Sequence, residues 1–404
     1  MFGFEFWQIF QGIYSLFHCS PEISLIRLLL IVIGLILIFL SYKQILDPLI
    51  LLPMGIGMVA INCGMLVLEG GRLSNLFLEP LVSDPTKLIE ILQIDFLQPV
   101  YTFTFSNGLI ACLIFMGIGA ITDLDFFIAR PFQSLILAVC AELGTVLTVP
   151  LAMAWGFNLK EAVSIGMVGG ADGPMVLYTS LLLSKNLFVP ITVIAYIYLS
   201  LTYAGYPYLI KLMVPKRLRG IPMDPMAIPE VSPAEKFTFS IVALVILCLL
   251  FPVAAPLFTS FFLGVAVKES GITRFLDFLE GPLLYGSTFF LGLTLGALFS
   301  VEIISNIAVL KLLILGMAAL LLSGIGGLIG GLIYCKISKG KVNPLLGIAA
   351  VSCVPTCAKV AQKAAADENN MAMILPFAMG PNVAGVITSA IICGIYVTAA
   401  PLFS

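Results

Sequence analysis

One carboxylate stands out because of its place in the sequence. Asp172 lies in the run Gly169-Gly-Ala-Asp-Gly-Pro174, within an otherwise charge-free stretch between Glu161 and Lys185. Glycine and proline at this density do not sustain a regular helix, so we expect the backbone to break there. A carboxylate in apolar surroundings is costly unless it meets a partner, and desolvation favours its neutral form. Asp172 is therefore a candidate site for a cation or a proton; the alternative is a structural aspartate that caps the second half-helix.

Neutral side-chain oxygens recur in two later stretches that also contain proline. The first begins at Asn343, carries Ser352 and Thr356, and ends at Lys359; the second places Asn382 directly after Gly-Pro. Carbonyl and hydroxyl oxygens are the ligands that hard cations prefer. Serine and threonine also pack between membrane helices without binding an ion, and that alternative stays open for the first stretch.

The composition indicates that lipid surrounds these residues. Of 404 residues, 60% are hydrophobic and 10% are charged, with a net charge of -2, whereas a soluble domain carries about 25% charged residues. The acidic balance and the single histidine, His18, exclude a nucleic-acid binder, which needs a basic field. The nine cysteines include no Cys-x-x-Cys pair, so we expect reduced, structural thiols rather than a metal centre. The sequence predicts an all-α polytopic membrane protein.

Charge-free intervals locate about eleven membrane segments, since a spanning helix needs about 20 apolar residues. Two of them, near 162–184 and 342–366, are interrupted by glycine or proline, so we expect broken or re-entrant segments there. The interval 143–159 extends back to Pro131 if Glu142 is allowed inside the membrane. The remaining intervals are 28–42, 48–68, 96–122, 186–210, 237–267, 281–301, 312–335 and 369–404.

The chain divides into two related halves. Gly166 and Pro174 in one half recur as Gly347 and Pro355 in the other, both at an offset of 181 residues. Paired segments interrupted by glycine or proline in corresponding places indicate a binding site near the middle of the membrane. The predicted regions are an interfacial amphipathic N-terminus (1–21), a membrane half with the GGADGP segment (22–214), a polar linker (215–236) and a second membrane half (237–404).

Four motifs in order resemble the β subunit of the sodium-pumping, biotin-dependent decarboxylases of bacteria. That family includes the oxaloacetate, methylmalonyl-CoA, glutaconyl-CoA and malonate enzymes. The resemblance implies a membrane subunit that decarboxylates carboxybiotin on a carrier protein and couples this reaction to sodium export in exchange for a proton. The motifs are Phe115-Met-Gly-Ile-Gly-Ala-Ile-Thr-Asp123, Gly169-Gly-Ala-Asp-Gly-Pro174, Asn343-Pro-Leu with Val351-Ser-Cys-Val-Pro355, and Gly380-Pro-Asn382-Val-Ala-Gly.

The resemblance also implies roles for individual residues. Asp172 matches the membrane aspartate that binds sodium and a proton in turn, and Tyr198 matches a functional tyrosine. Lys359 stands where the family usually has arginine, which implies a catalytic role and a contact with the carboxylated cofactor; lysine keeps the charge but loses the bidentate geometry. The polar residues implied in sodium binding beside Asp172 are Asn343, Ser352 and Asn382.

An enzyme of several chains in the bacterial cytoplasmic membrane is implied by the same resemblance. The ion would be sodium, and biotin would be carried on a partner subunit, since this chain has no Met-Lys-Met biotinylation site. The expected partners are a carboxyltransferase α subunit, a biotin carrier protein, a small membrane-anchor subunit and further copies of this chain. The alternative is a sodium-coupled secondary carboxylate transporter, which would share the repeat, the broken helices and the central aspartate.

Overall fold

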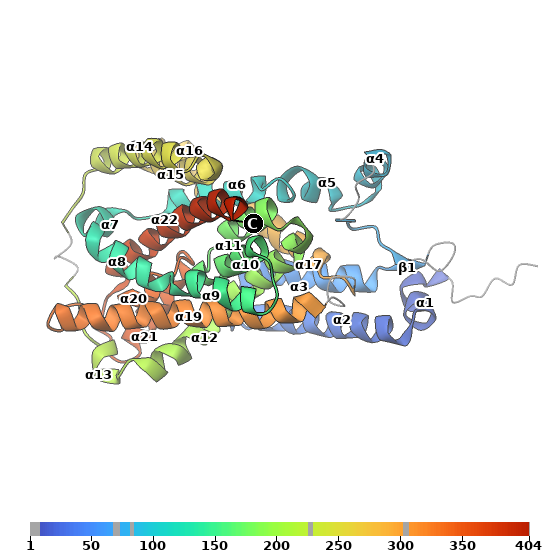
Figure 1. Cartoon of the computed structure of the whole chain (residues 1–404), viewed down its shortest axis with the longest axis horizontal. Helices are drawn as coiled ribbons and strands as arrows, with labels where there is room; N and C mark the ends of the chain where they lie inside the picture. Colours follow the sequence, from blue (N-terminus) through green and yellow to red (C-terminus); the bar gives the residue numbers. More distant parts are fainter. Residues whose placement is uncertain (1–8, 68–72, 81–84, 225–228, 302–306, 404) are drawn as a thin grey trace, which may run out of the picture. The chain divides into compact units, whose positions relative to one another are not determined.

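The computed structural model describes all residues except 1–8, 68–72, 81–84, 225–228, 302–306 and 404 (Figure 1). In the described ranges the chain is helical almost throughout, and the two short strands β1 (Leu66–Val67) and β2 (Leu73–Ser74) pair in antiparallel fashion. The predicted all-α architecture is confirmed. Parts of the predicted N-terminal region and of the linker lie outside the described residues.

The helices follow in chain order. Up to the linker they are α1 (Gln11–His18), α2 (Pro21–Tyr42), α3 (Pro48–Cys63), α4 (Pro85–Ile94), α5 (Gln98–Val100), α6 (Leu109–Ile121), α7 (Asp125–Ala129), α8 (Pro131–Ala141), α9 (Leu143–Ala154), α10 (Leu159–Gly166), α11 (Gly173–Leu183), α12 (Phe188–Met213) and α13 (Lys216–Arg219). After it they are α14 (Pro233–Leu250), α15 (Ala255–Glu269), α16 (Thr273–Phe278), α17 (Leu284–Leu298), α19 (Ile307–Ile337), α20 (Leu346–Ala349), α21 (Thr356–Ala366) and α22 (Leu375–Ala399).

Seven of the described helices are long and apolar enough to cross a membrane, or eight if a bent pair of helices counts as one span. The shorter apolar helices α3 and α11 come in addition. The polytopic architecture is therefore confirmed, whereas the predicted number of about eleven segments is not. Glu142 lies inside one of these spans, because α8 and α9 together form the candidate span Pro131–Ala154.

Local sequence signals explain where several helices begin. Ser232 and Glu235 form a reciprocal capping box at the start of α14, and Asn158 and Glu161 form another at α10. Each pair satisfies backbone N–H groups that the first helical turn leaves without partners. Proline follows the cap of α14 at once, where its fixed backbone angle favours the first turn.

The chain forms two compact units. One combines Met1–Ile110 with Ser287–Leu310, and the other combines Ala111–Gly286 with Lys311–Ser404. Every predicted site residue belongs to the second unit. Both units draw on residues from either side of the linker, and the relation between the two predicted halves of the sequence stays a prediction.

A buried arginine organises the first unit. Arg27 on α2 has no solvent exposure, and its Nε and Nη2 atoms donate to the carbonyl of Asn62 at 3.2 and 2.9 Å. Its Nη1 donates to the hydroxyl of Ser15 at 3.0 Å, and the amide of Asn62 donates to the carbonyl of Phe299 at 2.9 Å. Because a buried cation must be matched by hydrogen bonds, these contacts join α1, α2, α3 and the end of α17.

In the second unit α22, red in Figure 1, packs against α8, α11, α20 and α21. Close helix approach needs small residues. A Cβ atom at Gly347 on α20 would lie 1.9 Å from the carbonyl oxygen of Gly327 on α19, so only glycine fits there. Gly347 is one of the residues that recur at the 181-residue offset, and its partner position, Gly166, would meet the carbonyl of Thr145 at 2.7 Å.

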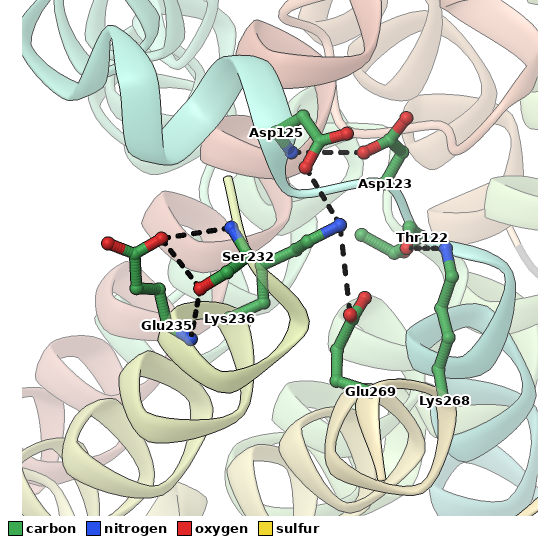
Figure 2. Close-up of polar contacts among 8 residues, drawn as sticks. All are labelled: Thr122, Asp123, Asp125, Ser232, Glu235, Lys236, Lys268 and Glu269. Carbon is green, nitrogen blue, oxygen red and sulfur yellow. Dashed lines mark hydrogen bonds and ion pairs between the residues drawn. The ribbon is translucent and has the colours of Figure 1, made fainter. Parts of the chain in front are cut away.

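An ionic cluster ties the α14–α15 hairpin to the connection between α6 and α7 (Figure 2). Lys236 Nζ lies 2.8 Å from Asp125 Oδ1 and 3.7 Å from Glu269 Oε2, and the lysine and glutamate side chains are largely buried. Lys268 Nζ donates to the carbonyl of Thr122 at 2.6 Å. Losing the lysine would leave two carboxylates without their shared cation, which costs more than breaking an exposed pair.

We predict that Lys236→Met lowers the free energy of unfolding by about 2 kcal/mol, because Glu269 would keep a poorly hydrated charge. Thermal unfolding of the purified protein in detergent measures this change. Lys336→Met is the matched control, since Lys336 is exposed and substitution of such a residue shifts stability by about 0.5 kcal/mol or less. Equal stability of the two variants would contradict a structural role for the cluster.

Candidate functional site

The first interrupted segment breaks where the glycines predicted it would. Helix α10 gives way to a 3-10 turn over Met167–Gly170, Ala171 takes the left-handed conformation with φ 55°, and Asp172 is extended before α11 begins. Asp172 is 4% exposed and occupies the N-cap position of α11, but its side chain makes no capping hydrogen bond. Its Oδ2 atom is buried without a hydrogen-bond partner. The break therefore positions the aspartate and leaves one of its oxygens without a partner.

The second interrupted segment also breaks, and it touches the first. Between α20 and α21 the chain is not helical around Ser352. The backbone N–H of Ser352 donates to the carbonyl of Gly170 at 3.2 Å, and the Ser352 hydroxyl donates to the same carbonyl. The two breaks therefore contact each other through Ser352 and Gly170.

Asn382 on α22 holds the second break in place. Its Nδ2 donates to the carbonyls of Ala349 and Val351 at 2.7 and 2.9 Å. Ala349 is the last residue of α20, where carbonyls lack helical partners, and Val351 lies in the non-helical stretch that follows. The amide oxygen Oδ1 of Asn382 is buried and has no hydrogen-bond partner, so it remains available as a ligand.

Tyr196 lies against Gly173, the residue that follows Asp172. A Cβ atom at Gly173 would lie 2.7 Å from the hydroxyl oxygen of Tyr196, and this buried hydroxyl has no hydrogen-bond partner. The Tyr198 hydroxyl instead donates to the carbonyl of Leu313 on α19 at 2.5 Å. Because the two tyrosines are two residues apart on α12, they point to different sides of the helix.

Two other predicted site residues have contacts elsewhere. Asn343 Nδ2 donates to the carbonyls of Arg219 and Ile221, both at 2.8 Å, and its Oδ1 accepts from the backbone N–H of Leu345 at 2.9 Å. Lys359 is exposed on α21. The structure therefore brings Asp172, Ser352 and Asn382 to the two breaks, whereas Asn343 anchors the α13 connection.

A glutamate that the sequence argument did not include in the site completes this region. Glu142 Oε2 accepts from the Thr145 hydroxyl at 2.5 Å, and Glu142 Oε1 is hydrogen-bonded to the hydroxyl of Ser389. The Ser389 oxygen lies 2.7 Å from that of Ser352. The sequence signal was a charge inside an otherwise apolar span, as for Asp172.

The donor set at the breaks suits a hard, singly charged cation. It offers a buried carboxylate oxygen, a free amide oxygen, hydroxyl groups and backbone carbonyls, which are oxygen ligands. Within the described ranges no group of three or more His, Cys, Asp or Glu side chains could hold a transition metal. Fold and site together define a multi-pass membrane protein in which two interrupted segments touch beside a buried carboxylate, an arrangement found in ion-transporting proteins.

Comparison with known proteins narrows this class to one family. The model of the Na+-transporting oxaloacetate decarboxylase beta subunit matches residues 26–400. The chain is 53% identical to the carboxybiotin decarboxylase of Malonomonas rubra over 97% of both chains, and 34% identical to the methylmalonyl-CoA decarboxylase subunit beta of Veillonella parvula over 91% of both. It is 33% identical to the oxaloacetate decarboxylase beta chain of Haemophilus ducreyi, over 96% of this chain and 97% of that one. The protein belongs to the family of sodium-transporting decarboxylase β subunits, as its motifs suggested.

The different placements of the two asparagines lead to a prediction. Asn343→Ala should lower the free energy of unfolding by about 2 kcal/mol, because two buried carbonyls lose their donor, and should leave the half-saturating sodium concentration unchanged. Asn382→Ala should cost similar stability and also raise that concentration by about tenfold, the effect of losing about 1.4 kcal/mol of binding. Thermal unfolding and sodium titration of each purified variant measure both effects. An Asn343→Ala variant with weakened sodium binding would show that Asn343 belongs to the ion site.

Proposed function

We propose that this chain decarboxylates carboxybiotin presented by a carrier protein and uses the reaction to export sodium in exchange for a proton. Its membership of the sodium-transporting decarboxylase family supports this function. The relative from Malonomonas rubra, which matches over nearly the whole length, is named a carboxybiotin decarboxylase. The family relationship also favours this function over the alternative of a secondary carboxylate transporter.

The observation that carries the proposal is the unpaired carboxylate oxygen of Asp172. It is buried at the break between two half-helices. The Ser352 hydroxyl donates to the carbonyl of Gly170 at the same break, and Asn382, whose amide oxygen has no hydrogen-bond partner, donates to the carbonyl of Val351. A carboxylate in such surroundings gains free energy from whichever cation is present, a proton or sodium. The two ions therefore compete, which is what an exchanger of sodium and protons needs.

We assign the sodium ligands to Asp172, Ser352 and Asn382. Asn343 is assigned a structural role, because it holds the start of the second interrupted segment against the backbone that follows α13. Tyr196 supplies a free hydroxyl beside Asp172, and Tyr198 fixes α12 against α19. Tyr196 therefore lies against the half-helix that begins at Gly173, whereas Tyr198 joins α12 to α19.

The chemistry at the carrier requires one proton. When the bond between the ureido nitrogen of biotin and the carboxyl carbon breaks, carbon dioxide leaves and the electron pair stays on nitrogen, which takes up the proton. We propose that Asp172 releases this proton when sodium binds, because the charge of sodium stabilises the ionised carboxylate. Export of one charge against 100 mV costs about 2.3 kcal/mol. An irreversible decarboxylation can shift the equilibrium between the inward-open and outward-open states of this chain by that amount.

We propose the partners that the family resemblance implies. A carboxyltransferase α subunit loads biotin, a biotin carrier protein delivers it, and a small membrane-anchor subunit and further copies of this chain complete the complex. We propose that Lys359 on α21 attracts the carboxylate of carboxybiotin. Its side chain is a solvent-exposed cation, and it lies seven residues after Ser352 in the second break. Biotin is a group on the carrier and sodium is the transported ion.

Asp172→Asn should abolish sodium-dependent decay of carboxybiotin and sodium uptake into vesicles, because the amide cannot exchange a proton for a cation. The reconstituted complex is assayed with a carboxylated carrier, with and without sodium. In the wild type the half-saturating sodium concentration should rise as the pH falls, since protons compete for the same carboxylate. Asp277→Asn, a substitution of an exposed aspartate on α16, is the control and should remain active. Sodium transport by the Asp172→Asn variant would refute the assignment.

Lys359→Ala should raise the KM for the carboxylated carrier by about tenfold, because one charge-assisted contact is worth about 1.5 kcal/mol or more. Lys359→Arg should retain most of the activity, since the charge is kept. Sodium affinity should be the same in both variants. An alanine variant with an unchanged KM would remove Lys359 from the carrier site.

A further inference from the structure

Glu142 is a buried acid whose surroundings contain hydroxyl groups and no cation. It is 4% exposed and stands between α8 and α9 in the middle of a candidate span. Among the described residues, none of the ion pairs involves it. The titratable groups that face it are Asp172 at the break and Tyr396 on α22. The α9 helix and the 3-10 turn contribute Thr145 and Gly170, which do not titrate.

A continuous chain of oxygen atoms connects Glu142 to the ion site. Glu142 Oε1 contacts the Ser389 hydroxyl, the Ser389 oxygen lies 2.7 Å from the Ser352 oxygen, and the Ser352 hydroxyl contacts the carbonyl of Gly170. Gly170 lies two residues before Asp172. On the other side, Glu142 Oε2 lies 2.5 Å from the Thr145 hydroxyl. Four oxygen–oxygen contacts therefore extend from Thr145 to Gly170.

The number of protons available along this chain indicates whether Glu142 is protonated or ionised. Each of the four contacts is at hydrogen-bond distance and needs one proton between its two oxygens. The hydroxyls of Thr145, Ser352 and Ser389 supply one proton each, and the carbonyl of Gly170 supplies none. If Glu142 were ionised, one contact would join two oxygens with no proton between them. A protonated Glu142 supplies the fourth, so that Glu142 donates to Ser389, Ser389 to Ser352, and Ser352 to Gly170.

We infer that Glu142 is a second proton-binding group of the ion site: it holds a proton in the conformation described here, positions the Ser352 hydroxyl through Ser389, and releases this proton when sodium binds. The inference rests on the proposed function, because it needs sodium to enter at Asp172 and Ser352. Sodium attracts the lone pairs of the Ser352 oxygen and turns its proton away from Gly170. Glu142 then passes its proton to Ser389, Ser389 passes its own proton to Ser352, and Ser352 gives its former proton to water, so the net change is one proton from Glu142 to solvent.

A glutamine at this position tests the inference because it imitates only the protonated acid. Its amide nitrogen would donate to Ser389 and its amide oxygen would accept from Thr145, so that the chain keeps all its hydrogen bonds. Glu142→Gln should therefore fold and bind sodium, but it cannot give up a proton. Glu230→Gln, which changes an exposed glutamate of the same unit, is the matched control.

The experiment counts the protons that the purified protein releases into weakly buffered detergent solution when sodium chloride is added. The wild type and Glu230→Gln should release the same number, and Glu142→Gln should release fewer by roughly one proton per chain. Equal release from Glu142→Gln and the wild type would overturn the inference. Sodium binding without any proton release in the wild type would overturn it too. Absence of sodium binding in the wild type would refute the proposed function itself.

An infrared measurement keeps the inference testable if Glu142→Gln does not fold. In Asp172→Asn, the carbonyl-stretching absorption of a protonated carboxylic acid should persist at neutral pH, because Glu142 is still present and buried. If Asp172→Asn shows no protonated-acid band, Glu142 is ionised and the inference is wrong.

Discussion

The contact between Ser352 and the carbonyl of Gly170 is the interaction on which the site depends. Two helices break inside an apolar environment, where each free backbone group costs several kcal/mol unless it is paired. The hydroxyl and N–H of Ser352 both satisfy Gly170, and Asn382 satisfies the end of α20. Because each break is completed by polar groups of another segment, neither break is stable alone. The contact between the two segments therefore stabilises the break at which Asp172 lies.

The same constraint explains how the site can respond to an ion. The hydroxyls of Ser352 and Ser389 and the carbonyl of Gly170 are neutral and hydrogen-bonded to one another, so the charge of the site depends on its two carboxyl groups. Asp172 leaves an oxygen free, whereas Glu142 uses both oxygens in hydrogen bonds. Asp172 can therefore bind a cation, whereas Glu142 is part of a chain of hydrogen bonds. A cation that binds at the first alters the hydrogen bonding that keeps a proton on the second.

Much of the fold and part of the site could be predicted from the sequence. The apolar intervals gave the all-α membrane architecture, and the glycines and prolines around Asp172 and Pro355 gave the two breaks, because both signals act locally on the backbone. The contacts of Asn343 with the α13 connection and of Tyr198 with α19 depend on distant segments, so side-chain type alone could not reveal them. Glu142 was visible only as a charge inside a span, and its partner Ser389 lies 247 residues away.

The central claim is that Asp172 forms the cation site where the two interrupted segments touch. Equilibrium binding of radioactive sodium to the purified protein tests it most directly, because it needs no partner subunit and no turnover. The wild type should bind sodium with an affinity that weakens as the pH falls, and Asp172→Asn should bind none above background although it remains folded. Undiminished sodium binding by Asp172→Asn would contradict the account and show that the ion site lies elsewhere in the protein.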